Sequence, residues 1–253
     1  MTIRVGVVGA GGRMGRTICA AVALDAELDL VAAIDPASGG EMLNGVSISS
    51  ELKALADAGA DVVIDFTVAH AAKVTLPWLA MHGMHAVVGT TGFTDEDVAN
   101  FRLAFSGSNC LIASNFAISA VLMMRFAEQA APYFESAEII EYHHENKIDA
   151  PSGTALATAE RMAAASTTWV ADPTQREVLP GARGGKGPAD IRVHSLRIKG
   201  MVAHQEVILG TQGQTLTIRQ DSYDRLSYMP GIVLACKRIA AHPGMSIGLD
   251  TFL

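Results

Sequence analysis

The chain has 253 residues, of which 49% are hydrophobic, and its formal net charge at pH 7 is −7. This length and apolar content are enough for one large or two modest globular domains, and they exclude a disordered chain. The acidic balance argues against a general nucleic-acid-binding protein, because such proteins need a basic excess.

The cysteines and the apolar runs indicate where the protein works. The chain has three cysteines, Cys19, Cys110 and Cys236, without a Cys-x-x-Cys pair or metal-ligand spacing. This usage fits a reducing cytoplasm and predicts no metal site. The first residues lead straight into a strand-like pattern, and no apolar run reaches membrane-spanning length. We therefore expect a cytoplasmic protein that binds neither membrane nor nucleic acid.

Strand-like and helix-like segments alternate over the first 113 residues. The strand-like runs are apolar throughout and end in polar, glycine-rich turns. Strands are expected at 3–8, 28–34, 61–67, 85–91 and 110–113, and helices at 14–24, 69–82 and 95–105. Strands of this kind are buried on both faces, so the order predicts an α/β fold with a doubly wound parallel sheet, the Rossmann type. Such sheets bind ligands beyond the carboxyl ends of their strands.

The pattern changes after a predicted helix at 118–131. Longer strands with polar alternation are expected at 137–143, 191–199, 203–209 and 215–220, the last two as a hairpin. A proline- and glycine-rich segment at 169–188 indicates a loop, and a helix at 230–241 could return to the first sheet. We predict a dinucleotide-binding domain from residues 1–117 and 226–253, and a second α+β domain with a mixed sheet from residues 118–225.

The turn after the first strand has the sequence GAGGRMG, from Gly9 to Gly15. Glycines between a strand and a helix let a pyrophosphate approach backbone N–H groups and the helix N-terminus. The spacing is G-x-x-G-x-x-G, because Met14 occupies the last position of a strict G-x-G-x-x-G pattern. A tight turn with close helix packing is the alternative. We favour dinucleotide binding because Asp35 ends the next strand.

Asp35 bears on which dinucleotide is bound. A carboxylate at this place could accept hydrogen bonds from the ribose hydroxyls of NADH, whereas the 2′-phosphate of NADPH would meet like charge. Pro36 follows it and no basic residue stands beside it, although Arg13 or Arg16 could reach over. A solvated loop aspartate is the alternative. We predict NADH, NADPH or both as cofactor, with NADH favoured.

A second cluster of polar residues lies in EIIEYHHENKIDAPSGTA, Glu138 to Ala155. If the first part is a strand, His143 and His144 point to opposite faces. Lys147 lies four residues from His143, so the two cations can converge on one cleft in either an extended or a helical chain. Ser152 or a neighbour can cap the helix that follows and leave N–H groups free for an anion.

The alternative for this cluster is a capped helix preceded by surface histidines. Two histidines, a lysine and a helix N-terminus within a dozen residues favour a substrate site instead. Asp149 and Glu145 are expected to orient the lysine or to face solvent, and Glu141 to be a strand-surface charge.

The segment also matches a family pattern, E-[I/V]-x-E-x-H-x-x-x-K-x-D-x-P-S-G-T-A, at every specified position. In this and other motifs the chain resembles the family of 4-hydroxy-tetrahydrodipicolinate reductase, formerly dihydrodipicolinate reductase, of the lysine and meso-diaminopimelate pathway. The resemblance covers nearly the whole chain. It includes GAGGRMG, DFT at 65–67, VVGTTGF at 87–93 and SNF at 114–116, and a tail, GTQGQTLTIRQDSYDR, similar to actinobacterial members.

The resemblance implies an oxidoreductase that reduces a cyclic dicarboxylate with NAD(P)H and is a homotetramer formed through its second domain. It implies that His143 donates the proton and that Lys147 is a second acid or charge partner. The substrate's carboxylates would be held by His144, Lys147, Ser152, Gly153 and Thr154. The cofactor would be lined by Gly9, Ala10, Gly11, Gly12, Arg13, Met14, Asp35, Phe66, Thr67, Gly89, Thr90, Thr91, Ala113, Ser114, Asn115 and Phe116. Pro36 stands where some members have a basic residue, which leaves the cofactor preference open.

Two other interpretations keep the Rossmann domain. A non-catalytic, dinucleotide-sensing regulator would explain the glycine turn and Asp35, but not the proton donors at 143–154. The second alternative is another two-domain dehydrogenase, such as an aldehyde or amino-acid dehydrogenase. The second domain has no cysteine before Cys236, which argues against an enzyme that works through a thioester.

Overall fold

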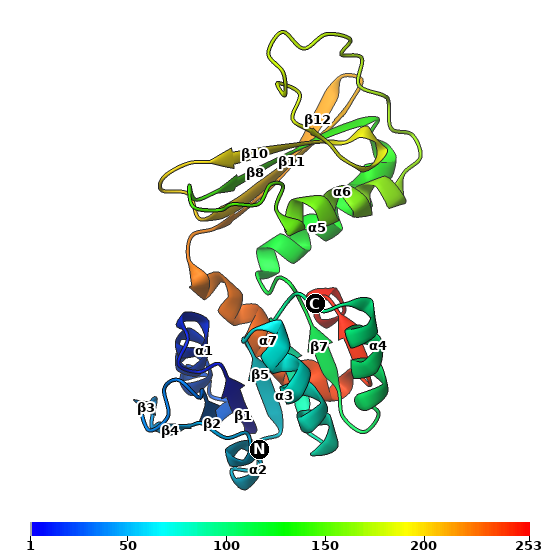
Figure 1. The fold of residues 1–253 in the computed structure, drawn as a ribbon. Helices are drawn as coiled ribbons and strands as arrows, with labels where there is room; N and C mark the ends of the chain where they lie inside the picture. The colour runs from blue at the N-terminus through cyan, green and yellow to red at the C-terminus, as the bar shows by residue number, and fades with distance from the viewer. Residues whose placement is uncertain (1) are drawn as a thin grey trace. The chain divides into compact units, whose positions relative to one another are not determined.

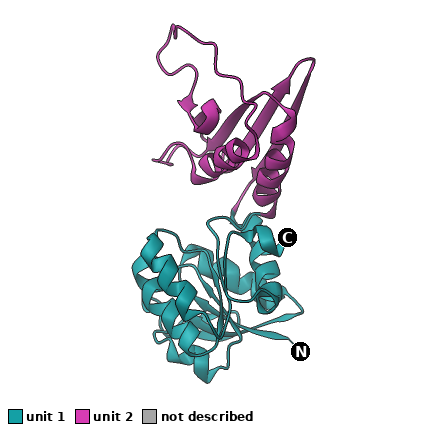
Figure 2. Ribbon diagram, turned by 90° about the vertical axis from the view of Figure 1, so that its right-hand side faces the viewer, with its two compact units in different colours: residues 1–117, 225–253 teal, residues 118–224 magenta. Residues whose placement is uncertain are grey.

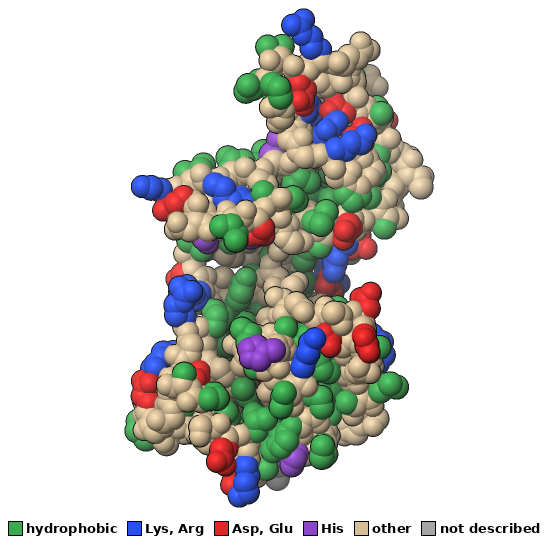
Figure 3. Space-filling model, in the orientation of Figure 1, with side chains coloured by type: hydrophobic (Ala, Val, Ile, Leu, Met, Phe, Trp, Pro, Cys, Tyr) green, Lys and Arg blue, Asp and Glu red, His purple; other side chains and the backbone are tan. Residues whose placement is uncertain are grey.

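The computed structural model describes residues 2–253, which form two compact units (Figure 1 and Figure 2). The first unit contains the residues up to 117 together with Arg225–Leu253, and the second contains Ile118–Asp224. Within the described range, no helix combines the length and the apolar character needed to cross a membrane. Acidic and basic side chains are interspersed on the face shown in Figure 3. An anionic ligand on this face would therefore have to be bound by individual cationic or N–H groups near it.

A sheet of eight strands forms the centre of the first unit, in the order β13-β7-β6-β5-β1-β2-β4-β3. Neighbouring strands are parallel except for β3 and β4. The strand order reverses at β1, which is the topological switch point where sheets of this kind bind ligands. The strands are β1 Ile3–Val8, β2 Leu28–Ile34, β3 Met42–Leu43, β4 Val46–Ser49, β5 Val62–Asp65, β6 His85–Val88, β7 Cys110–Ile112 and β13 Met245–Ile247.

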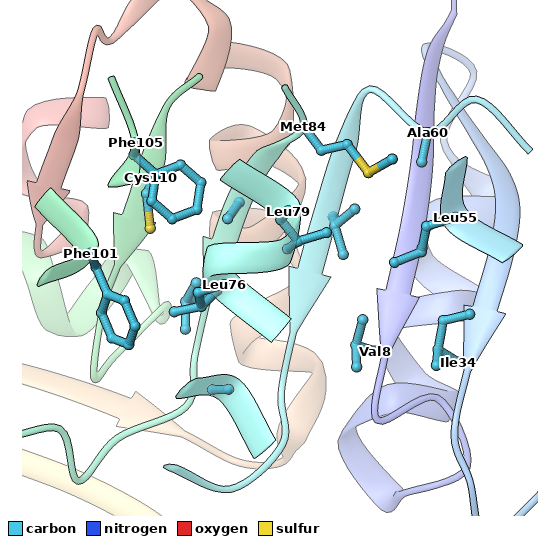
Figure 4. Packing of buried hydrophobic residues seen from close by; sticks show 14 of the residues in the cluster. Val8, Ile34, Leu55, Ala60, Leu76, Leu79, Met84, Phe101, Phe105 and Cys110 are labelled. Atoms are coloured by element: carbon cyan, nitrogen blue, oxygen red, sulfur yellow. The ribbon is translucent and has the colours of Figure 1, made fainter. Parts of the chain in front are cut away.

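Helices pack on this sheet through apolar stripes. They are α1 Arg13–Leu24, α2 Lys53–Asp57, α3 Ala69–Met81, α4 Asp95–Ala104 and α7 Met229–Arg238. Helix α1 buries Ile18, Cys19 and Val22, which share one face at helical spacing. Figure 4 shows part of the core, in which Leu76 and Leu79 of α3 lie in one buried cluster with Phe101 of α4 and with Phe105, which follows α4.

The second unit has a mixed sheet in the order β12-β11-β8-β10-β9. The central strand, β8, runs parallel to β10 and antiparallel to β11. The strands are β8 Ser136–His143, β9 Gly185–Lys186, β10 Arg192–Arg197, β11 Ala203–Thr211 and β12 Gln214–Ser222. Helices α5 Ile118–Ala130 and α6 Gly153–Ala165 lie on one face of this sheet (Figure 1). Short 3₁₀ turns span Ala131–Tyr133, Pro188–Asp190, Arg225–Tyr228, Ile239–Ala241 and Leu249–Phe252.

The predicted fold class is confirmed, with a parallel Rossmann-like sheet in the first unit and a mixed sheet in the second. Elements β3, β4, α2, β9 and β13 were not predicted, because runs of two to five residues carry too little periodicity. The strands expected at 61–67 and 85–91 end earlier, at Asp65 and Val88.

Candidate cofactor and substrate sites

The glycine-rich turn joins β1 to α1. Gly9 has a φ of +83°, which favours glycine, and a Cβ there would lie 2.7 Å from the carbonyl oxygen of Phe66. A Cβ on Gly15 would lie 2.0 Å from the Gly9 carbonyl oxygen, so this glycine lets α1 pack against the turn. Gly12 is the N-cap of α1 and has no side chain that could bind the N–H groups of the first turn. The turn therefore fits a pyrophosphate group.

Asp35 follows β2 at the same edge of the sheet. Its Oδ2 accepts a hydrogen bond from the Gly11 N–H at 3.0 Å, and its Oδ1 accepts one from the Ala37 N–H at 2.9 Å. A cavity of about 500 Å³ opens beside it, and its lining includes the predicted residues Gly9, Gly12, Asp35, Phe66 and Thr67. The α3 side of this cavity is mostly apolar, so the cavity fits an adenine ring next to a ribose that a carboxylate can bind.

Asp65 is buried at the end of β5 and forms hydrogen bonds with the loop after β5 and the loop after β6. Its Oδ1 accepts hydrogen bonds from the Thr67 hydroxyl and the Thr90 hydroxyl, both at 2.7 Å. Burial raises the pKa of Asp65, and the hydrogen bonds from these threonines oppose the rise. A Cβ on Gly89 would lie 2.1 Å from the Phe66 ring, so only glycine fits beneath it. Predicted cofactor residues from both loops are thus held in one cluster.

Arg16, in the first turn of α1, is bound to Glu41, a residue that the sequence did not single out. Its Nη1 and Nη2 donate to the two carboxylate oxygens of Glu41, each at 2.7 Å, and its Nε donates to the Gly11 carbonyl at 3.0 Å. The hydrogen bond from Arg16 lowers the pKa of Glu41, so this carboxylate is anionic at neutral pH. Arg13 is exposed.

In the second unit, a buried carboxylate lies beside His143. The Glu141 side chain is fully buried, and its Oε2 contacts Nδ1 of His143. Nη1 and Nη2 of Arg197 donate to Oε2 and Oε1 of the same carboxylate at 3.1 and 2.9 Å. Burial acts to raise the pKa of Glu141, but hydrogen bonds from His143, Arg197 and Ser195 outweigh it and lower the pKa to about 2.

This geometry decides which nitrogen of the imidazole can exchange a proton. An ionised carboxylate only accepts hydrogen bonds, so Nδ1 of His143 carries a hydrogen and Nε2 is left for proton transfer. The expectation that Glu141 is a strand-surface charge is wrong. Alternate residues of a strand share a face, and Glu141 lies with the buried Ile139 on the side of β8 that the helices cover.

Arg197 also holds the loop that follows β8. Its Nε donates to the Lys147 carbonyl at 3.2 Å, and its Nη2 donates to the Asp149 carbonyl at 2.6 Å. The Lys147 ammonium donates to both carboxylate oxygens of Asp149 at 2.8 Å, so Asp149 orients the lysine as expected. His144 is exposed at the start of this loop. Arg197 was missed in the sequence, because its place opposite His143 comes from the pairing of β10 with β8, which the sequence does not show.

Helix α6 begins at Gly153, and Ser152 is its N-cap. The Ser152 hydroxyl accepts a hydrogen bond from the Ala155 N–H at 3.2 Å, which confirms that a residue of this turn caps the helix. A Cβ added to Gly153 would meet nothing within 4 Å, so the space above this first turn is open. A helix N-terminus of this kind fits a carboxylate.

The predicted residues thus form two groups, the cofactor residues in the first unit and residues 143–154 in the second. A solved amine dehydrogenase from Mycobacterium smegmatis shares the fold, with a TM-score of 0.68 at 14% identity over 99% of this chain and 96% of that one. A Rossmann domain with a glycine-rich turn after its first strand and an acidic residue after its second, together with a mixed-sheet domain, places the chain in the class of two-domain dinucleotide-dependent oxidoreductases.

Closer comparisons narrow this class to one family. The models of the dihydrodipicolinate reductase N-terminus and C-terminus match residues 3–116 and 119–253. The 4-hydroxy-tetrahydrodipicolinate reductases of Corynebacterium aurimucosum and Nocardia farcinica are 48% and 49% identical to this chain, over 100% of it and 99% of each relative. The structure of dipicolinate-bound dihydrodipicolinate reductase from Paenisporosarcina sp. TG-14 aligns over 100% of both chains, with a TM-score of 0.92 at 35% identity. The chain belongs to the dihydrodipicolinate reductase family.

Proposed function

We propose that the protein reduces 4-hydroxy-tetrahydrodipicolinate to tetrahydrodipicolinate with NADH or NADPH, in lysine and meso-diaminopimelate biosynthesis. Its family membership supports the reaction, and the observation that carries the proposal is the contact of His143 Nδ1 with the buried, anionic Glu141. This contact supports the proposal that Nε2 of His143 is the proton donor that a reductase needs.

The reaction makes three demands on the site. A bound nicotinamide would supply the hydride. His143 would deliver a proton from Nε2 to the ring atom where negative charge develops, and Glu141 would orient the imidazole through its contact with Nδ1. Lys147 would be a second acid or a charge partner. A dicarboxylate also needs hydrogen-bond donors, and His144, Lys147, Ser152, Gly153 and Thr154 would hold its two carboxylates at the start of α6.

Binding of a substrate analogue tests this assignment. The Paenisporosarcina structure has dipicolinate bound, and we expect this protein to bind the same planar dianion. Lys147→Ala should weaken dipicolinate binding about tenfold or more, because a charge-assisted hydrogen bond is worth roughly 1.5 to 3 kcal/mol. Isothermal titration calorimetry measures the change. Arg176→Ala, which removes an exposed cation from the same unit, is the matched control. Equal affinities of wild type and Lys147→Ala would reject the role of Lys147.

We propose that the cofactor lies along the carboxyl ends of the first sheet. The lining would be residues 9–14, Asp35, Phe66, Thr67, residues 89–91 and residues 113–116. NADH is the favoured cofactor because both of its ribose hydroxyls can donate to Asp35. Asp35→Ala should lower the ratio of kcat/KM with NADH to kcat/KM with NADPH by about tenfold, the worth of a lost charge-assisted hydrogen bond. A wild-type protein that strongly prefers NADPH would contradict this preference.

We also propose a cytoplasmic homotetramer formed through the second unit. The sheet face opposite α5 and α6 carries partly exposed apolar side chains that a partner sheet could cover, namely Ile140, Tyr142, Leu196 and Ile208. The three cysteines are buried and unpaired, as suits a reducing compartment. Light scattering should give the mass of four chains, and the mass of one chain would refute the tetramer.

A further inference from the structure

The Arg16–Glu41 pair lies next to the place proposed for the adenosine ribose. Gly11 connects the two, because its N–H donates to Asp35 and its carbonyl accepts from Arg16. The segment from Asp35 to Glu41 curls over this glycine, and a Cβ on Gly11 would lie 2.2 Å from the Ser38 hydroxyl oxygen. The guanidinium and Asp35 are therefore neighbours on the same edge of the site.

A 2′-phosphate on this ribose would need a cation. Residues 35–41, DPASGGE, contain no lysine or arginine, so the segment itself offers none. The guanidinium of Arg16 has the planar fork that binds a phosphate through two parallel hydrogen bonds. Both prongs of that fork donate to Glu41.

We propose that Glu41 is a specificity-determining residue, which favours NADH over NADPH by occupying the arginine that a 2′-phosphate would use. This inference rests on the proposed cofactor site. Asp35 disfavours the 2′-phosphate because both groups are negatively charged. Glu41 adds to this effect because it accepts the hydrogen bonds that Arg16 would otherwise donate to the phosphate. The side chains of Arg16 and Glu41 are 41% and 45% exposed. An exposed pair contributes little to folding, so Glu41 can be removed without loss of the fold.

Direct cofactor binding, measured by fluorescence titration at low ionic strength without substrate, tests the proposal. Glu41→Ala should lower the Kd for NADPH about tenfold or more, the worth of the charge-assisted hydrogen bonds that Arg16 becomes free to make. The Kd for NADH should change less than about twofold, because NADH has no group for this fork. Asp57→Ala is the matched control, since it removes a carboxylate from another exposed ion pair of the first unit, with Lys53.

A second variant tests whether the gain in NADPH affinity comes from the guanidinium of Arg16 or only from the loss of one negative charge. The gain in NADPH affinity should disappear in Glu41→Ala/Arg16→Gln. A gain in NADPH affinity that persists in this double variant would overturn the inference. An NADPH-to-NADH affinity ratio of Glu41→Ala that equals the ratio of Asp57→Ala would also overturn it. Either result would leave the proposed cofactor site standing. If neither cofactor binds to any variant or to the wild type, the proposed cofactor site fails, and the inference fails with it.

Discussion

His143→Ala is expected to lower kcat by about a hundredfold or more while the Kd for NADH stays nearly unchanged. The imidazole is the proton donor of the proposed reaction, and positioned proton transfer contributes two to four orders of magnitude to a rate. Alanine leaves Glu141 bound to Arg197, so the anion stays paired. Steady-state kinetics and a fluorescence titration of NADH give the two quantities.

A matched histidine provides the control for this variant. His194, on the neighbouring strand β10, also bonds a carboxylate, since its Nε2 lies 2.5 Å from Glu138 Oε2. His194→Ala removes a similar pair from the same sheet, and its kcat should remain within a few-fold of wild type. A wild-type rate in His143→Ala, or an equal loss in both variants, would refute proton donation by His143.

Arg197→Ala is expected to lower the free energy of unfolding by about 3 kcal/mol at pH 7. Removing one partner of a buried ion pair typically costs roughly 3 to 5 kcal/mol, because the other charge stays buried without its partner. The lower end applies, since the Arg197 side chain is 20% exposed while that of Glu141 is fully buried. The variant also loses the hydrogen bonds that hold the carbonyls of Lys147 and Asp149. Urea unfolding measures the change. Lys186→Ala is the control and should change stability little, because the Lys186 side chain is 67% exposed and Asp190 keeps its pair with Arg192.

The effect of Arg197→Ala should depend on pH. The pKa of Glu141 is about 2 in the folded protein, below its ordinary value of 4.5. The unfolded chain therefore binds more protons between these values, so the stabilisation is complete above about pH 4.5 and is lost as the pH falls toward 2. The difference in stability between wild type and Arg197→Ala should shrink as the pH falls below about 4.5. A difference that stays constant down to pH 3 would show that Glu141 is not the group that Arg197 stabilises.

Much of the first unit could be predicted because its signals are local. The predicted bounds of β1 and β2 agree with the structure at every residue, since each is an apolar run that a turn ends. Strand β4 shows the limit of such signals. It has four residues, yet its Ser49 carbonyl accepts a hydrogen bond from the Asp35 N–H and so helps to position the acidic residue.

The parts of the site that were missed depend on distant partners. Glu141 is buried because Arg197 lies beside it, and 56 residues separate the two in sequence. The pairing of Arg16 with Glu41 spans 25 residues and depends on the segment after Asp35, whose course was not predicted. A charged side chain can be buried only when a partner offsets its loss of hydration, and the sequence does not show which partner the fold will bring.

The most direct test of the proposed activity is the oxidation of NADH and NADPH, in parallel, with substrate made in place from pyruvate and aspartate semialdehyde by a purified synthase. We predict oxidation that depends on the synthase and is faster with NADH. If a cofactor binds and neither cofactor is oxidised, the fold assignment stands, but the roles of His143 and Lys147 in this reduction are contradicted.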